Sequence, residues 1–286
     1  MNKARGNLLP FFLLTYAVMW ASFFTVAFAR IPANSALGIF LLRLGAYAPS
    51  LVAIFLTARA AGGAGVSHLV SGVFKWRVPV RYYILAVAFI PAIKLAAALL
   101  YRLISGAWPR MGSESLLLIP LAIVFSTPFQ AGEEIGWRGY ALPRLADRFG
   151  LRISSVILGL IWALWHVPQF FIRDAPEFGQ SFPVYVLQVT ALGVGFAWLY
   201  ARTNCSLLLV MLLHSATNNA KDIFPSASPG ATNTFGLNAS LLAWLTVALL
   251  WICAGYFLWR MPKWDSSRQA SEPLPPNVAS RSPSVA

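Results

Sequence analysis

The chain has 286 residues, of which 58% are hydrophobic and 11% are charged. A soluble globular protein is about half apolar and about one-quarter charged, so this composition excludes an ordinary soluble domain. The formal net charge is +13, but the basic residues lie between apolar runs and not in one patch, which argues against nucleic-acid binding and favours contact with a lipid bilayer.

Apolar runs recur along the chain and predict an all-α fold, a polytopic transmembrane bundle of about eight helices. The fourth and seventh runs are short, and both end in polar residues. We therefore expect these two helices to continue into a cavity that is lined by protein. The expected spans are Leu8–Ala29, Ala36–Ala58, Tyr82–Ile104, Ser115–Gln130, Ile153–Ile172, Phe182–Tyr200, Cys205–Asn218 and Leu241–Leu258.

The distribution of Lys and Arg predicts the orientation of these spans. With the amino terminus inside, most of the 22 basic residues fall on the inner side, as cytoplasmic loops require. Both termini are therefore predicted to be cytoplasmic, in a plasma (inner) membrane. The first run ends in small residues that resemble a signal-peptide cleavage site, but its length favours an uncleaved helix. Arg43 and Lys94 fall within spans, where we expect them to snorkel or to pair.

The chain is expected to form one membrane-embedded domain over residues 1–261. Within it, Gly62–Lys75 is a Gly-rich turn followed by a mildly amphipathic stretch, which we place as a loop on the cytoplasmic surface with His68. Residues 262–286 are rich in Pro and Ser and are predicted to form a disordered cytoplasmic tail.

Ionisable residues at membrane depth are costly, so each one is a candidate for function. Glu133 and Glu134 are adjacent acids at the end of the fourth run. His166 lies deep in the fifth run, and His214 lies near the end of the seventh, one helical turn before Asn218. We expect three separate helices to bring these polar groups to one cavity.

Helical spacing predicts how the neighbouring side chains pair, because residues four apart share one face of a helix. Glu134 and Arg138 are so placed and can form an ion pair. This pairing leaves Glu133 pointing about 100° away and available for another role. Trp162 lies one turn before His166, so its ring can pack against the imidazole.

These residue types are the parts needed to hydrolyse an amide bond. A carboxylate beside imidazoles can take a proton from water. Two histidines and a carboxylate can also hold a metal ion that keeps a position open for water. Asn218 can donate to a developing oxyanion, a contribution worth about 3 kcal/mol.

Each feature also has a structural explanation. An acid pair at a helix end is often solvated, a buried histidine is often a packed core residue, and Asn218 can simply end a helix. The combination on three helices favours a shared site. Other protease signatures are missing from the sequence, including His-Glu-x-x-His, Gly-x-Ser-x-Gly and an aspartate within an apolar run.

Three motifs follow one another within residues 129–220, namely Glu133-Glu134-x-x-Trp137-Arg138-Gly139, Trp162-x-x-x-His166 and His214-x-x-x-Asn218. In this order they resemble the pattern of the CPBP (or Abi) family, which includes CAAX prenyl endopeptidases and bacteriocin-processing enzymes. The second motif of the family usually begins with Phe. Trp162 departs from that pattern but keeps an aromatic ring.

The resemblance implies an eight-helix membrane protease that cleaves a membrane-associated peptide or protein. Members are commonly described as metalloproteases, with metal-free activation of water as the alternative description. The implied catalytic residues are Glu133, His166, His214 and Asn218, with Glu134, Arg138 and Trp162 in support. The candidate metal ligands are Glu133, His166 and His214, and zinc is the expected ion.

A non-catalytic role is the alternative, since a transporter or a bacteriocin-immunity protein can use the same polar residues as an ion path or a binding surface. The sequence does not identify the substrate or say whether it is prenylated. Arg144 follows Glu133 after about 16 Å of helix and is predicted to be cytoplasmic. We therefore expect the site to open nearer the cytoplasmic side.

Overall fold

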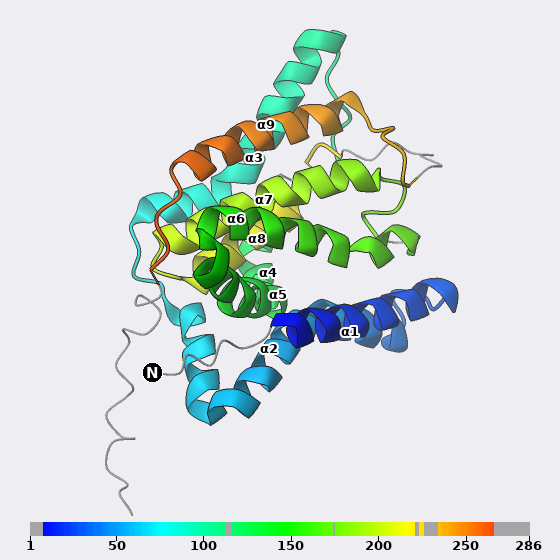
Figure 1. Ribbon diagram of the computed structural model, residues 1–286. Coiled ribbons are helices and arrows are strands. Elements are labelled where there is room, and N and C mark those ends of the chain that lie inside the picture. Colours follow the sequence, from blue (N-terminus) through cyan, green and yellow to red (C-terminus); the bar gives the residue numbers. More distant parts are fainter. Residues whose placement is uncertain (1–7, 113–115, 174, 221–222, 226–233, 266–286) are drawn as a thin grey trace, which may run out of the picture.

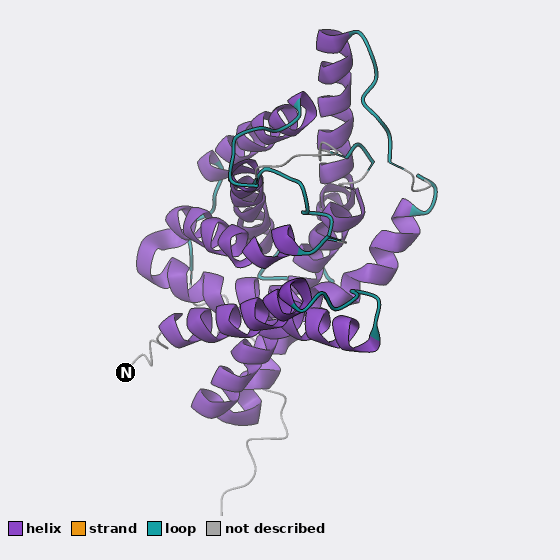
Figure 2. Ribbon diagram, turned by 90° about the vertical axis from the view of Figure 1, so that its right-hand side faces the viewer, coloured by secondary structure: helices purple, strands orange, loops and turns teal. Residues whose placement is uncertain are grey.

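The computed structural model describes residues 8–112, 116–173, 175–220, 223–225 and 234–265, and all regular structure within these ranges is helical (Figure 2). The prediction of an all-α bundle is confirmed. Most of the predicted tail, from residue 266 onward, lies outside the described residues. The helices are α1 (Leu8–Phe28), α2 (Ala36–Ser71), η1 (Gly72–Phe74), α3 (Val80–Ser105), α4 (Ile119–Ser126), η2 (Thr127–Gln130), α5 (Ala131–Glu134), η3 (Ile135–Ala141), α6 (Leu142–Trp165), η4 (Val167–Phe171), α7 (Phe182–Arg202), α8 (Leu207–Ala220) and α9 (Leu241–Trp259).

Six helical stretches among the described residues are long and apolar enough to cross a membrane. One of them, Ile119–Phe171, has 53 residues and covers most of both the fourth and the fifth expected spans. The seventh expected span corresponds to α8, whose 14 residues are fewer than a bilayer crossing needs. Large apolar side chains such as Leu103 and Phe125 stay exposed on the outer helices, as expected for a surface that contacts lipid.

The helices enclose the short central segment α5. It packs against α2 on one side and contacts α8 on the other (Figure 1). Around this centre, α1 pairs with α2, α6 pairs with α7, and α9 packs on α7 and α3. The centre of the bundle is therefore where residues from the three sequence motifs can meet.

The segment predicted as a surface loop is helical. Helix α2 continues past Gly62 to Ser71, so His68 lies on a helix and not in a loop. Gly62 has φ 61°, a left-handed conformation that glycine adopts readily, and α2 bends there. The sequence pattern missed this helix because glycine marks a turn in most contexts, whereas here it bends a helix that then resumes.

Candidate active site

The two adjacent acids lie where the helical geometry changes. Glu133 and Glu134 end the four-residue helix α5, which follows the 3₁₀ turn η2 and leads directly into the π-helix η3. π-helical turns are rare and occur frequently at functional sites. The irregular backbone therefore coincides with the first motif.

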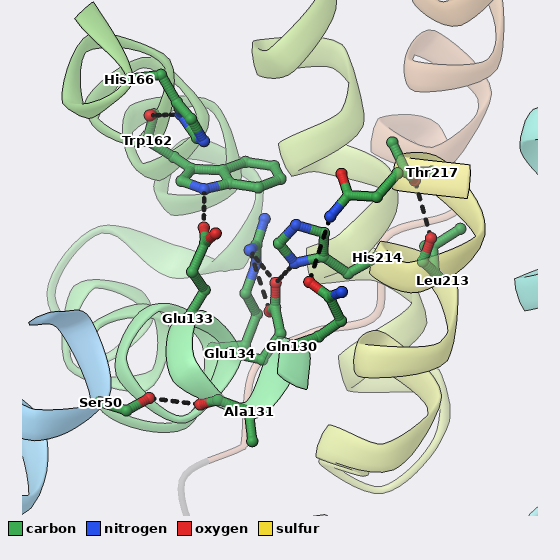
Figure 3. Close-up of polar contacts among 12 residues, drawn as sticks. Ser50, Gln130, Ala131, Glu133, Glu134, Trp162, His166, Leu213, His214 and Thr217 are labelled. Carbon is green, nitrogen blue, oxygen red and sulfur yellow. Dashed lines mark hydrogen bonds and ion pairs between the residues drawn. The ribbon is translucent and has the colours of Figure 1, made fainter. Parts of the chain in front are cut away.

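Two glycines bring this segment close to α2. A Cβ atom on Gly132 would lie 2.8 Å from the ring of Tyr47, and one on Gly136 would lie 2.4 Å from the backbone carbon of Pro49. Ser50 Oγ also donates to the carbonyl oxygen of Ala131 at 2.5 Å (Figure 3). Small residues one turn apart let helices pack closely, so α5 is held against α2.

Glu134 is the centre of a buried charged network. Arg138 Nη1 donates to both oxygens of the Glu134 carboxylate, at 2.9 and 3.0 Å, which confirms the predicted pair. His214 Nδ1 donates to Glu134 Oε1 at 2.7 Å. Glu134 is 0% exposed and Arg138 is 1% exposed, so neither charge is solvated. The guanidinium instead lies 4.3 Å from the ring of Trp162.

Glu133 points away from this network, as the helical spacing predicted. Trp162 Nε1 donates to Glu133 Oε2 at 2.8 Å, and the second carboxylate oxygen remains available (Figure 3). The rings of Trp162 and His166 lie 5.7 Å apart in an edge-to-face contact, which confirms their predicted packing. Trp162 therefore does more than fill space, because its indole N–H orients the carboxylate; a Phe at this position has no such donor.

Hydrogen-bond partners assign the proton positions of both histidines. His166 Nδ1 lies 2.7 Å from the carbonyl oxygen of Trp162, which only accepts, so Nδ1 carries the proton. His214 Nδ1 likewise faces the carboxylate of Glu134. In each imidazole, Nε2 is left for other chemistry.

All four candidate catalytic residues line one cavity of about 540 Å³, a volume within the usual range for ligand sites. Glu134 and Arg138 do not line the cavity, but they contact the lining residues His214 and Trp162. The walls are formed by α1, α2, α5, α6, α7, α8 and the segment between α6 and α7. The lining residues are Phe23, Ala33, Ile39, Leu42, Arg43, Ala46, Glu133, Trp162, His166, Gln169, Ile172, Ala175, Pro176, Glu177, Tyr185, Gln188, Val189, Leu192, His214, Thr217 and Asn218.

The cavity includes polar residues that sequence reasoning did not place there. Arg43 on α2 is exposed and lines the wall, with its guanidinium 5.4 Å from the ring of Phe129. Glu177 is 6% exposed and lies in the connection before α7. A charge inside an apolar run was a usable signal for Arg43, but no local pattern pointed to Glu177. Gln130 accepts a hydrogen bond from Asn218 Nδ2 at 3.3 Å.

The candidate metal ligands do not form a metal centre in this arrangement. Among the described residues, no three His, Cys, Asp or Glu side chains lie close enough together to hold a metal ion. Glu133, His166 and His214 share the cavity, but the three side chains do not gather around one point. The expected zinc site does not fit the residues as they are placed.

The cavity reaches two of the connections between helices. Its lining includes Ala33 and Pro176, which lie in the two connections that the Lys and Arg distribution assigns to the outer side. The prediction of a cytoplasmic opening treated the chain from Glu133 to Arg144 as a straight helix. Between Glu133 and Arg144 the chain instead passes through the π-helix η3. The side on which the cavity opens therefore stays a prediction.

Comparisons with known proteins agree with the motifs. A family model described as type II CAAX prenyl endopeptidase Rce1-like matches residues 112–220. CAAX prenyl protease 2 of Methanococcus maripaludis is 26% identical over 238 residues, which cover 76% of this chain and 85% of that protein. Both matches support the CPBP family, which the three motifs predicted.

Proposed function

We propose that this chain is an intramembrane endopeptidase of the CPBP family, which cleaves a membrane-associated, CAAX-type peptide or protein by activating water with Glu133. The observation that carries the proposal is the cavity itself. A carboxylate, two imidazoles and an amide, from three helices, line one space at the centre of an apolar bundle. Desolvated polar groups of this kind are costly to keep without a function.

Glu133 is the proposed general base. One of its oxygens is held by the indole of Trp162, and the other can accept a proton from water. His166 Nε2 can accept a hydrogen bond from the same water, because Nδ1 carries the ring proton. The water oxygen then bonds to the carbonyl carbon. When the C–N bond breaks, the proton held by Glu133 passes to the leaving amine.

The oxyanion formed in the first step needs donors. Asn218 Nδ2 has two N–H groups, and one of them is engaged by Gln130. The other can donate to the oxyanion. Such donors contribute about 10²–10³-fold in kcat.

No step of this mechanism passes through a metal, because the candidate ligands do not gather around one point.

The apolar part of the cavity suits a lipid-modified substrate. Phe23, Ile39 and Leu42 line one side, and Ile172 and Leu192 line another. A prenyl group beside the cleavage site would occupy this space, in accordance with the name of the archaeal relative. The non-catalytic alternative gives no role to the orientation of Glu133 by Trp162.

The test is cleavage of a farnesylated CAAX peptide by the purified full-length protein in detergent. We expect cleavage by the wild type and none by Glu133→Gln. The amide of Gln still accepts the Trp162 hydrogen bond but cannot take a proton, so thermal unfolding of this variant should match the wild type. The same peptide without its prenyl group is the substrate control. Full activity of Glu133→Gln would reject the mechanism.

A further inference from the structure

A second cavity shares no lining residue with the proposed active site and is lined in part by Gly139 of the π-helix η3. Its volume is about 220 Å³, and none of the residues named above as catalytic lines it. This volume is below the usual range for a drug-sized ligand, but it is several times the roughly 30 Å³ that one water molecule occupies. The space therefore suits a small chemical group.

Basic residues from three segments line this cavity. His68 comes from α2 beyond the bend at Gly62, Lys75 follows η1, and Arg144 comes from the first turns of α6. None of the described lining residues is acidic. Segments that are distant in the sequence thus bring basic residues to one hollow whose described lining contains no carboxylate.

Neutral polar groups add to the lining. Thr57 is 8% exposed, and its buried hydroxyl has no hydrogen-bond partner among the described residues. The hydroxyl of Ser71 donates to the carbonyl oxygen of His68. Burying a hydroxyl without a partner costs free energy, and the cost of Thr57 is removed if a bound group supplies an acceptor.

We propose that this cavity binds a phosphate group. The guanidinium of Arg144 already contacts Tyr140, with Nη1 donating to the Tyr140 carbonyl oxygen at 2.8 Å, and this contact fixes its plane. A fixed guanidinium suits two-point binding of phosphate, and Lys75 adds a compact charge. Phosphate oxygens point in several directions and can meet donors from three segments. The flat carboxylate group matches this arrangement less well.

Two sources can supply the group, an anionic lipid headgroup or a soluble phosphate. His68, Lys75 and Arg144 all lie at the end of the bundle that the Lys and Arg distribution assigns to the cytoplasm, where anionic lipids attract basic residues. This proposal does not depend on the proposed protease activity, because the two cavities share no lining residue.

The test measures thermal unfolding of the full-length protein with two probes. In detergent, inorganic phosphate replaces chloride at constant ionic strength, so that general screening stays unchanged. In nanodiscs, phosphatidylcholine alone is compared with phosphatidylcholine containing phosphatidylglycerol. A bound ligand raises the unfolding temperature in proportion to its occupancy of the folded state.

The cavity variants are Lys75→Gln alone and Lys75→Gln with Arg144→Gln. The single variant keeps the contact between Arg144 and Tyr140. It therefore tests the proposal even where the double variant fails to fold. The matched control is Arg59→Gln with Arg77→Gln, two exposed residues with the same predicted orientation that do not line the cavity.

We expect wild type and control to be stabilised by at least one probe, and the apparent affinity to fall at least tenfold in the cavity variants. Stabilisation by phosphate alone identifies a soluble ligand, whereas stabilisation by phosphatidylglycerol alone identifies a lipid headgroup. Equal responses in all four proteins, or no response to either probe, would overturn the proposal.

Discussion

The carboxylate of Glu134 lies 2.7 Å from Nδ1 of His214, although the two residues are 80 positions apart in the sequence. This contact joins the first motif to the third and fixes the direction in which the imidazole meets the cavity. A carboxylate behind a histidine is a common way to set the tautomer and orientation of a functional ring. Glu134 is therefore a positioning residue, distinct from its neighbour Glu133.

Glu134→Gln should lower both stability and activity, in contrast to Glu133→Gln. Removing one partner of a buried ion pair leaves Arg138 without its counter-charge, a change that costs about 3–5 kcal/mol. We expect a clearly lower unfolding temperature in detergent, together with reduced kcat. If Glu134→Gln unfolded like the wild type, Glu134 would not hold the buried network together.

Asn218 and Asn219 are neighbours with different expected roles. Asn218 lines the cavity, and its loss to Ala should lower kcat by about 10²–10³-fold with little change in stability. Asn219 Nδ2 donates to Ser126 Oγ and to the Ser215 carbonyl oxygen, each at 2.8 Å, and thereby joins α8 to α4. Asn219→Ala should lower the free energy of unfolding by about 1–3 kcal/mol. Parallel kinetic and unfolding measurements separate the two effects, and an interchange of these outcomes would contradict the assignment.

Arg43→Gln should weaken binding of a substrate that has a free carboxylate near its cleavage site. The Arg43 side chain is the cationic group that lines the proposed active-site cavity from α2, and a charge-assisted hydrogen bond is worth about 1.5–3 kcal/mol. We expect KM to rise at least tenfold while kcat changes little. Amidation of the substrate carboxylate should produce a similar rise with the wild type and no further rise with the variant. Arg59→Gln, on the same helix but outside the cavity, is the control.

Metal chelation should leave peptide cleavage unchanged. Glu133, His166 and His214 are not gathered as ligands, so the proposed water activation relies on the protein groups themselves. The measurement is cleavage before and after treatment with a chelator, alongside metal analysis of the purified protein. One zinc ion per chain, lost in both His166→Ala and His214→Ala, would show that the residues rearrange around a metal.

The membrane class and the identity of the polar residues followed from the sequence alone. Apolar run length predicts spans because the bilayer thickness sets it. The pairing of Glu134 with Arg138 and the packing of Trp162 on His166 were predictable because both partners lie on one stretch of chain, where helical periodicity fixes their relative direction.

Only the tertiary structure decided which groups meet across helices. The bond from Trp162 to Glu133, the bond from His214 to Glu134, and the place of Arg43 on the cavity wall depend on how the helices cross. That crossing is set by close approaches, such as Gly136 against Pro49, and by the bends at Gly62 and Gly150. A periodic pattern specifies the faces of one helix, but it contains no information on the distance or angle to the next.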